Sequence, residues 1–533
     1  MHYWRAEPDA WAPCLRAMHE LGFTHVETPV PWRVHEAARG DFDWTAERDV
    51  GAFIALARSI GLGVVIRPGP VAGNELTSFG VPDWVLAEPA CRAVTSRGTP
   101  AWLPSPPRAF PIPSLASRAF RAHVGRWFAE VARVVPHDVT IAIDQASLVR
   151  DAAFDLDYHA DAIGWFGEDP PRTWQPDDAA RCVRWVRFRE GYEARARREF
   201  ADELRGVGFA ELVELPAIAV GGSAWLPPFP EVDDRDRVIA RLATGARRFV
   251  LVMAVERERH FGALIDRHGK VRAAWVKPLL AALIESGWPS LQRATPIAVL
   301  DVAADRRFGI ATSLVDPVTP VVADMLGLGA ANLGSDAGAI AMRTWQVAVC
   351  RALELAQVPY RVVDERTSAD ELARFTAVIA PTLDRVDRVA WENLRGLAET
   401  KRCIVVIGPG TPTRDEFDQP LEAAAPRRMG RLEPGSTSDL PGLAAALASL
   451  AGELPEAWQV ERPSGVRSSA FADASGAVKL VIVQADAQRP ATATLLADPS
   501  VALLRDALTG ESIAVRDGRV TLAITGARVL VVS

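Results

Sequence analysis

The sequence predicts an α/β protein whose first half is a parallel (β/α) barrel of the TIM type. Short apolar strands alternate with helices that carry apolar residues at a spacing of three and four, between residues 11 and 66. The loops that follow these strands are rich in Trp, His, Glu and Arg. In a parallel barrel the carboxyl ends of the strands carry the chemical residues, so this loop composition favours the barrel.

The predicted elements of the barrel follow in chain order. The first helix ends at Gly22, and residues 24–32 form a strand that runs into a loop. A second helix over residues 53–60 precedes the strand 64–66. The segment 140–143 is a short apolar strand that breaks into polar residues at its carboxyl end. That end is where catalytic residues are expected.

The barrel is expected to be shortened. A helical stretch over residues 184–204 is followed by one convincing strand, 212–220, before the apolar strand 249–254. A complete barrel needs further strand–helix units in this interval. The sequence therefore predicts that one or two units are missing, and that the exposed strand edges are covered by another domain or subunit.

The pattern changes twice in the second half. Apolar strands over 296–301, 376–381 and 402–408 alternate with helices, which predicts a small flavodoxin-like or Rossmann-like α/β domain. After Ser468 the apolar period falls to two, which predicts an antiparallel β-sandwich. The predicted units are a barrel (1–290), an α/β domain (291–430), a linker with a short helix (431–465) and a C-terminal β-sandwich (466–533).

Composition excludes several classes of function. The chain has 533 residues, too many for a single core, and 49% hydrophobic with 24% charged residues is ordinary for a soluble globular protein. A net charge of -7 argues against a protein that binds nucleic acids without regard to the nucleotide sequence. The five cysteines are scattered and are expected to be reduced core residues, with neither metal nor cofactor bound. Without an apolar leader or a run of about 18 apolar residues, a cytoplasmic protein with no membrane partner is expected.

Several short blocks then point to a family. The first 85 residues contain, in order, His2–Arg5, Glu27–Trp32, His35–Glu36, Gly40–Asp43, Arg67–Pro70, Glu75 and Gly80–Trp84. This series resembles the opening of a family 35 glycoside hydrolase. Two later blocks, Asp157–His159 and Val255–Gly262, are similar to a bacterial β-galactosidase-like branch of that family. The resemblance implies a β-galactosidase-like protein of carbohydrate metabolism.

The resemblance also locates the expected catalytic residues. Retaining members of this group use two glutamates about 5 Å apart, one as acid/base and one as nucleophile. The acid/base position falls on Ala146, and the nucleophile position falls on Val220 or Gly221. No carboxylate occurs between residues 216 and 230. The usual retaining mechanism is therefore expected to be lost, and Asp144 is the candidate for a relocated acid.

The same resemblance implies a sugar site. Its expected residues are Tyr3, Glu27, Trp32, Glu75 and Gln145. Each polar residue also has a simpler interpretation. Glu27 and His35–Glu36 are equally suited to buried ion pairs that hold loops, Arg67 is suited to fixing its own loop, and Glu256 with Glu258 to an ion-pair network at the pocket rim.

Three hypotheses follow. The first is a β-galactosidase-like pseudoenzyme that binds a small saccharide, such as a β-galactoside, or supports a partner subunit. The second is an active β-glycosidase with relocated carboxylates, such as Asp144 and Glu75, or with carboxylates from a neighbouring subunit. The third is a purely structural subunit. The α/β and C-terminal domains resemble the trimerisation and β domains of family 42 β-galactosidases, which implies a homo-oligomer, a trimer or a dimer.

Overall fold

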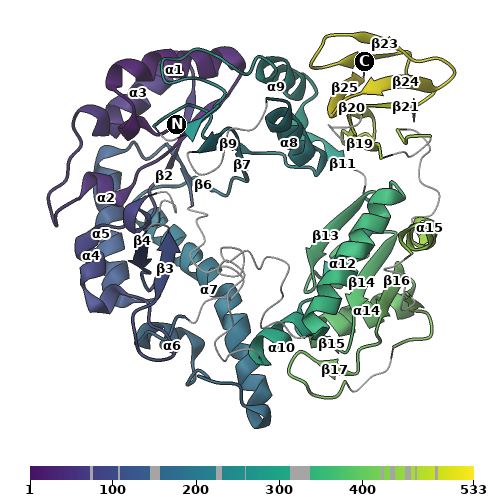
Figure 1. Cartoon of the computed structure of the whole chain (residues 1–533), viewed down its shortest axis with the longest axis horizontal. Coiled ribbons are helices and arrows are strands. Elements are labelled where there is room, and N and C mark those ends of the chain that lie inside the picture. Colours follow the sequence, from purple (N-terminus) through teal and green to yellow (C-terminus); the bar gives the residue numbers. More distant parts are fainter. Residues whose placement is uncertain are drawn as a thin grey trace.

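The structure is a computed structural model with three packed regions (Figure 1). It describes residues 1–71, 76–105, 108–143, 156–223, 231–258, 260–293, 295–312, 337–421, 425–432, 439–450, 458–461, 465–485 and 490–532. None of the helices within these ranges combines the length and the apolar character that crossing a bilayer requires.

Parallel strands form the inner layer of the first region. One sheet has the order β1 (His25–Pro29), β2 (Gly63–Arg67), β5 (Thr140–Ala142) and β6 (Leu212–Val213), and β7 (Ala217–Ala219) pairs in parallel with β9 (Val250–Val252). Figure 1 shows α1 (Pro8–Leu21), α3 (Val50–Ile60) and α5 (Arg118–Val134) on the outer side of these strands. The arrangement is that of a parallel α/β barrel.

The predicted helix ends are confirmed. Gly22 and Gly61 cap α1 and α3 with φ of 93° and 98°, a left-handed conformation that glycine adopts without steric strain. Strand β2 is apolar over Val64–Ile66 and its side chains are buried on both faces, as expected for a strand covered by helices on one side and by the barrel interior on the other.

The described barrel strands do not form a closed ring. They fall into two hydrogen-bonded groups, and within the described ranges no ladder joins β9 to β1 or β6 to β7. The other elements of this region are α2 (Trp32–His35), α4 (Asp83–Ala87), α6 (Ala160–Phe166), α7 (Ala179–Gly206), α8 (Glu231–Ala243), α9 (Val276–Glu285), the hairpin β3 (Trp102–Ser105) and β4 (Arg108–Pro111), and the antiparallel pair β8 (Gly222–Ser223) and β10 (His260–Phe261).

The second region contains a five-stranded parallel sheet. Its order is β13 (Tyr360–Asp364), β12 (Ile297–Asp301), β14 (Ala377–Thr382), β16 (Ile404–Pro409) and β18 (Gly430–Arg431). Alternate residues of β12 face opposite sides: Ile297 and Val299 belong to the core under α12 (Ala337–Leu355), and Ala298 and Leu300 to the core under α14 (Arg388–Thr400). Helices on both faces define the doubly wound fold predicted from the sequence.

The short helix expected within residues 431–465 is present as α15 (Leu440–Leu450). Leu443 and Leu447 are buried in the same apolar cluster as Trp345 of α12, so this helix packs onto the α/β core. Its many alanines and leucines give it an apolar face that is stable only when it is covered. The region also contains α10 (Ala304–Thr312), α13 (Ala369–Leu372) and the parallel pair β15 (Arg385–Val386) and β17 (Arg414–Asp415).

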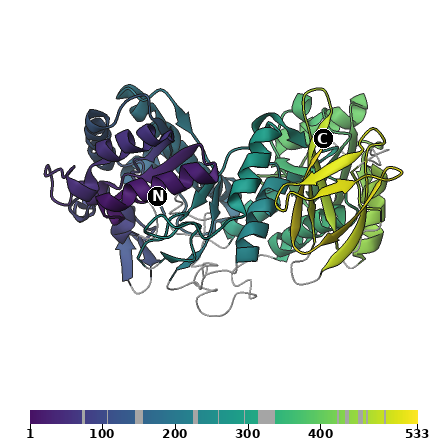
Figure 2. The ribbon, with the colours of Figure 1, turned by 90° about the horizontal axis from the view of Figure 1, so that it is seen from above.

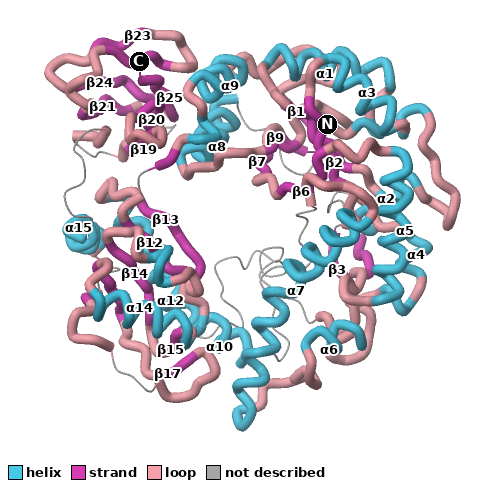
Figure 3. Tube along the Cα trace, turned by 180° about the vertical axis from the view of Figure 1, so that it is seen from behind, coloured by secondary structure: helices cyan, strands magenta, loops and turns pink. Residues whose placement is uncertain are grey.

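The C-terminal region is an antiparallel β structure, in agreement with the apolar period of two. One sheet has the order β11 (Gln292–Arg293), β19 (Arg467–Ala472), β20 (Val478–Gln484), β25 (Ala527–Val532), β22 (Leu503–Asp506) and β23 (Ser512–Ala514), and β21 (Ala491–Leu496) pairs with β24 (Arg519–Ile524). Apolar residues of both sheets, Val481 and Leu522 among them, share one core. Figures 2 and 3 show this region beside α8 and α9.

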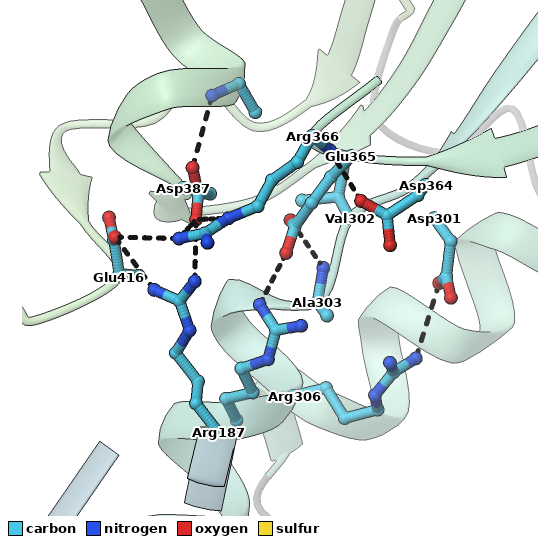
Figure 4. Close-up of polar contacts among 12 residues, drawn as sticks. Arg187, Asp301, Val302, Ala303, Arg306, Asp364, Glu365, Arg366, Asp387 and Glu416 are labelled. Atoms are coloured by element: carbon cyan, nitrogen blue, oxygen red, sulfur yellow. Dashed lines mark hydrogen bonds and ion pairs between the residues drawn. The ribbon is translucent and has the colours of Figure 1, made fainter. Parts of the chain in front are cut away.

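A group of buried ion pairs connects the long helix α7 to the α/β region (Figure 4). Arg187 of α7 lies 3.6 Å from a carboxylate oxygen of Asp387 and 3.2 Å from one of Glu416. Both acids are buried, and Arg366 also contacts Asp387, at 2.7 Å. Burying these carboxylates is tolerable only because arginines lie beside them.

A second group fills the carboxyl edge of the doubly wound sheet. Arg307 of α10 pairs with Glu190 of α7 at 2.6 Å and also with buried Glu365, which follows β13. The other oxygen of Glu365 accepts the backbone N–H of Ala303, directly after β12, at 3.0 Å. In doubly wound folds this edge is where ligands bind. Here protein side chains occupy part of it, which favours a structural role for the region.

Replacing Arg187 with alanine should lower the free energy of unfolding by about 2 kcal/mol, because Asp387 and Glu416 lose a buried partner. The value is at the low end because Arg366 remains beside both acids. Arg184→Ala is the matched control: this residue lies one turn earlier on α7 and pairs with half-exposed Glu168, so the loss should be below about 1 kcal/mol. Urea unfolding compares the two variants, and equal losses would contradict this account.

Candidate active site

The carboxyl ends of the parallel strands define the candidate site, because parallel strands in one barrel end on the same side. The residues after β1, β2 and β7 are described, and so is Ile143 after β5. The acid/base position Ala146, its neighbours Asp144 and Gln145, and Glu75 lie outside the described residues. The roles assigned to these four residues stay predictions.

Tyr3 and His35 form a buried pair near the end of β1. The Tyr3 hydroxyl lies 2.7 Å from His35 Nε2, and His35 Nδ1 lies 2.9 Å from the carbonyl oxygen of Asp43. Because a carbonyl only accepts, Nδ1 carries the proton, and Nε2 accepts from Tyr3. Burial lowers the pKa of His35 to about 4, so the ring is neutral near pH 7. The phenol ring of Tyr3 also stacks on Phe53.

Trp32 and Glu36 form a second buried pair in the same loop. Trp32 Nε1 donates to Glu36 Oε2 at 2.6 Å, and the Gly40 N–H donates to Oε1 at 2.7 Å. Arg126 of α5 lies 2.8 Å from the same carboxylate, which is fully buried. The described contacts therefore give Glu36 the loop-holding role weighed in the sequence analysis. They give both Tyr3 and Trp32 a packing role, since neither side chain is exposed.

Glu27 and Arg67 pair inside the barrel. Glu27 is on β1 and Arg67 ends β2, and Glu27 Oε1 lies 3.0 Å from Arg67 Nε. Both side chains are largely buried. The pair matches the structural interpretation of these residues, and a sugar contact by Glu27 stays a prediction.

At Gly221, one of the two residues predicted at the nucleophile position, backbone atoms leave no room for a side chain. Val220 is buried, and its carbonyl accepts a hydrogen bond from His260 Nε2 at 3.0 Å. Gly221 follows with φ of 69°, and its N–H donates to Asp234 at 3.0 Å. A Cβ atom on Gly221 would lie 2.7 Å from the carbonyl oxygen of Phe261, closer than side-chain carbons approach. A glutamate at residue 221 therefore requires the backbone to move.

A group of basic residues lies near the nucleophile position. His2 stacks on Trp4 with ring centroids 4.5 Å apart. The pKa of His2 is well below its usual range because of burial, followed by neighbouring positive charges that include Arg257, Arg5 and His260. Arg5 pairs with Glu258 at 2.9 Å, as expected of an ion-pair network at the pocket rim. The sequence analysis did not assign His2 or His260, because residues so far apart in the chain give no joint pattern.

Asp157, part of a block that carried the resemblance, is fully engaged with the protein. It accepts from the hydroxyls of Ser114 and Tyr192 at 2.5 and 2.8 Å, and from the backbone N–H groups of Val94 and His159 at 3.1 and 2.9 Å. Burial raises the pKa of Asp157, and these donors oppose the shift. A carboxylate with four donors holds segments together.

A cavity of about 420 Å³ lies between β1 and β9. It is bordered by residues at or before the amino ends of strands, such as Thr24, Thr140 and Arg248, and also by Glu27. In parallel barrels this end contributes to stability rather than chemistry. Most of the cavity therefore lies at this end, although Glu27, a predicted sugar contact, and Leu215 and Ala254, which follow β6 and β9, also border it.

The fold and this site define the class as a parallel α/β barrel with its candidate site at the carboxyl ends of the strands, and comparisons with known proteins relate this barrel to a family. Residues 1–103 match the sequence model of Glycosyl hydrolases family 35. Human beta-galactosidase-1-like protein 2 is 38% identical over 96 residues, which make up 18% of this chain and 15% of that protein. The sequence match is thus confined to a small part of the relative.

Solved structures extend the similarity to the whole chain. The β-galactosidase from the psychrophilic Marinomonas ef1 matches with a TM-score of 0.69 at 12% identity, over 100% of this chain and 99% of that chain. The E323A catalytic mutant of Gan42B, a family 42 β-galactosidase from G. stearothermophilus, matches with a TM-score of 0.63 at 12% identity, over 99% of this chain and 97% of that chain. At this identity they show the fold alone. The family 35/42 β-galactosidase-like resemblance predicted from the sequence is confirmed.

The neutral state of His35 predicts that stability depends on pH. In the unfolded chain this histidine binds a proton near pH 6.5, and in the folded protein only near pH 4. Between these values the unfolded state holds more protons, so stability falls as the pH is lowered, by about 3 kcal/mol from this residue. His35→Gln keeps an acceptor for Tyr3 and should reduce that loss in urea unfolding at pH 7 and pH 4.5. His137→Gln, at an exposed histidine, is the control. An equal reduction of the pH-dependent stability loss in this variant would refute the role given to His35.

Gly221→Ala should destabilise the protein more than Gly245→Ala. Both glycines have positive φ, at 69° and 92°, so both variants incur backbone strain of about 1 kcal/mol. Only the Cβ at residue 221 meets backbone atoms; none lies within 4 Å at residue 245. Thermal unfolding should show a further loss of about 2 kcal/mol for Gly221→Ala. Equal losses of unfolding free energy in the two variants would mean that the backbone around residue 221 can shift at little cost.

Proposed function

We propose that the chain is a β-galactosidase-like glycoside hydrolase homologue that binds a small saccharide and has lost the usual retaining hydrolysis. The observation that carries the proposal is the nucleophile position. Val220 is buried, and a side chain on Gly221 would collide with the backbone of Phe261. With Ala146 at the acid/base position of the sequence, both carboxylates of the two-glutamate mechanism are absent.

The retained part of the family pattern supports saccharide binding rather than a purely structural role. The match to family 35 covers residues 1–103, the part that contains the loops after β1 and β2. Glu27 and Glu75 lie in this part and are predicted sugar contacts, and Gln145, which follows it in the chain, is a third. A β-galactoside is the substrate class that this similarity favours.

The proposal also covers the oligomeric state and the cellular location of the protein. The α/β region carries ion pairs at the sheet edge where ligands bind in comparable folds, which supports a role in holding subunits or domains. We accordingly propose a homo-oligomer, a dimer or a trimer, in the cytoplasm.

Hydrolysis of an aryl β-galactoside tests the proposal. The wild type, Asp144→Asn, Glu75→Gln and the double variant should all stay at the rate of the uncatalysed reaction. Turnover that one substitution abolishes would refute the pseudoenzyme and identify a relocated carboxylate. Galactose should raise the unfolding temperature of the wild type, because a ligand that binds only the folded state stabilises it. If the wild type shows no turnover and galactose does not raise its unfolding temperature, the structural-subunit hypothesis is favoured.

A further inference from the structure

Three potential metal ligands converge on the outside of the barrel, at the junction of α4 and α5. Glu88 follows the last turn of α4, Cys91 ends the short 3-10 helix Pro89–Cys91, and His123 lies in the second turn of α5. Glu88 Oε2 lies 3.1 Å from His123 Nε2 and 3.9 Å from Cys91 Sγ. All three ligand atoms lie within 4.8 Å of one another, and no other such triplet occurs in the described ranges.

Two of the three separations match those around one small cation, and the third, from His123 Nε2 to Cys91 Sγ, lies within 4.8 Å. Zinc bonds of about 2.3 Å to sulfur and about 2.0 to 2.1 Å to nitrogen and oxygen, at tetrahedral angles, place the nitrogen and oxygen about 3.4 Å apart and the sulfur and oxygen about 3.6 Å apart. The observed 3.1 and 3.9 Å need adjustments of only a few tenths of an ångström. Thiolate, imidazole and carboxylate together are a donor set that zinc accepts and that calcium or magnesium does not prefer.

The surrounding protein holds the ligands in place. Ser117, at the N-terminus of α5, donates from its hydroxyl to the Ala90 carbonyl at 2.6 Å, which ties α5 to the turn that carries Cys91. The Cys91 N–H donates to the Glu88 carbonyl at 3.0 Å, which fixes the spacing of these two ligands. The ring of Trp84 packs edge-on against His123 at 5.1 Å. Ligands with restricted movement bind a metal with a smaller loss of entropy.

We propose that Glu88, Cys91 and His123 bind a zinc ion with water as the fourth ligand. Cys91 is buried, whereas Glu88 and His123 are partly exposed, so the open coordination position faces solvent. Binding replaces the thiol proton of Cys91 with a Zn–S bond, and the proton passes to water. The ion would link the turn after α4 to α5, and the site is independent of the saccharide proposal.

The simpler alternative is a hydrogen-bonded group without metal. In it His123 donates to Glu88, Cys91 donates its S–H to the same carboxylate, and burial together with Glu88 raises the pKa of the Cys91 thiol to about 12. Arg39, 3.6 Å from the other oxygen of Glu88, contributes a positive charge to this group. The two accounts differ in their response to thiophilic metal ions, and this difference can be measured.

Cobalt(II) titration of the metal-free, reduced full-length protein tests the proposal, because thiolate–cobalt bonds absorb in the near ultraviolet and tetrahedral cobalt absorbs intensely in the visible. One equivalent should bind with both signals, and zinc should displace it. Cys91→Ser should remove the thiolate band, and His123→Gln should weaken zinc binding at least about 10-fold. Cys14→Ser is the control, since Cys14 is also buried but its thiol donates to the backbone carbonyls of Asp266 and Arg267.

The expected thermal readout is a rise in the unfolding temperature with zinc for the wild type and Cys14→Ser, and none for Cys91→Ser. His123→Gln keeps a side-chain amide beside Glu88, so it tests the site even if the Cys91 variant folds poorly. Absence of a thiolate band in the wild type, or a band that persists in Cys91→Ser, would overturn the proposal. Neither result depends on hydrolysis or on galactose binding.

Discussion

Buried charged groups in this protein are stable only because each meets a partner, and much of the structure depends on that constraint. Glu36 is enclosed yet receives donors from Trp32, Gly40 and Arg126. Asp387 and Glu416 are buried beside Arg187 and Arg366 in the contact between α7 and the α/β region. Removing one partner from such a group leaves a buried charge unpaired, which destabilises more than the loss of a surface pair. These residues are therefore tied to folding, whatever the protein binds.

The same constraint bears on the proposed loss of hydrolysis, because it separates the acids that hold the fold from those that would face a substrate. A catalytic carboxylate must face substrate, so it contributes little to holding the surrounding loops together. Glu27, Glu36 and Asp157 each hold two or more segments by direct contacts. If Val220 stands in place of the nucleophile, as we propose, the change removes a desolvated charge and adds a buried apolar side chain. We therefore expect folding to depend on the loop-holding acids more than on a catalytic pair.

Sequence reasoning succeeded where the determinants are local. The glycine caps at Gly22 and Gly61 and the alternating strand Ala491–Leu496 follow from a few neighbouring residues. It failed where residues distant in the chain decide the outcome. The sequence does not reveal that Leu443 packs beside α12, or that the hydroxyl of Tyr3 faces a histidine 32 residues later. The approach of His123 to Cys91 is of the same kind, since it depends on how α5 sits against the preceding turn.

The similarity in sequence and the similarity in fold cover different lengths of the chain, and side-chain packing accounts for the difference. The match in sequence stops at residue 103, whereas the fold matches over the whole chain at 12% identity. Barrel strands need only buried apolar side chains, which many residues supply, so sequence diverges there without loss of fold. The loops after β1 and β2 need particular donors and acceptors at particular places, which restricts substitution. At Gly221 the restriction is stronger still, because the backbone of Phe261 occupies the space of any side chain. A glutamate at residue 221 would therefore require a change of backbone.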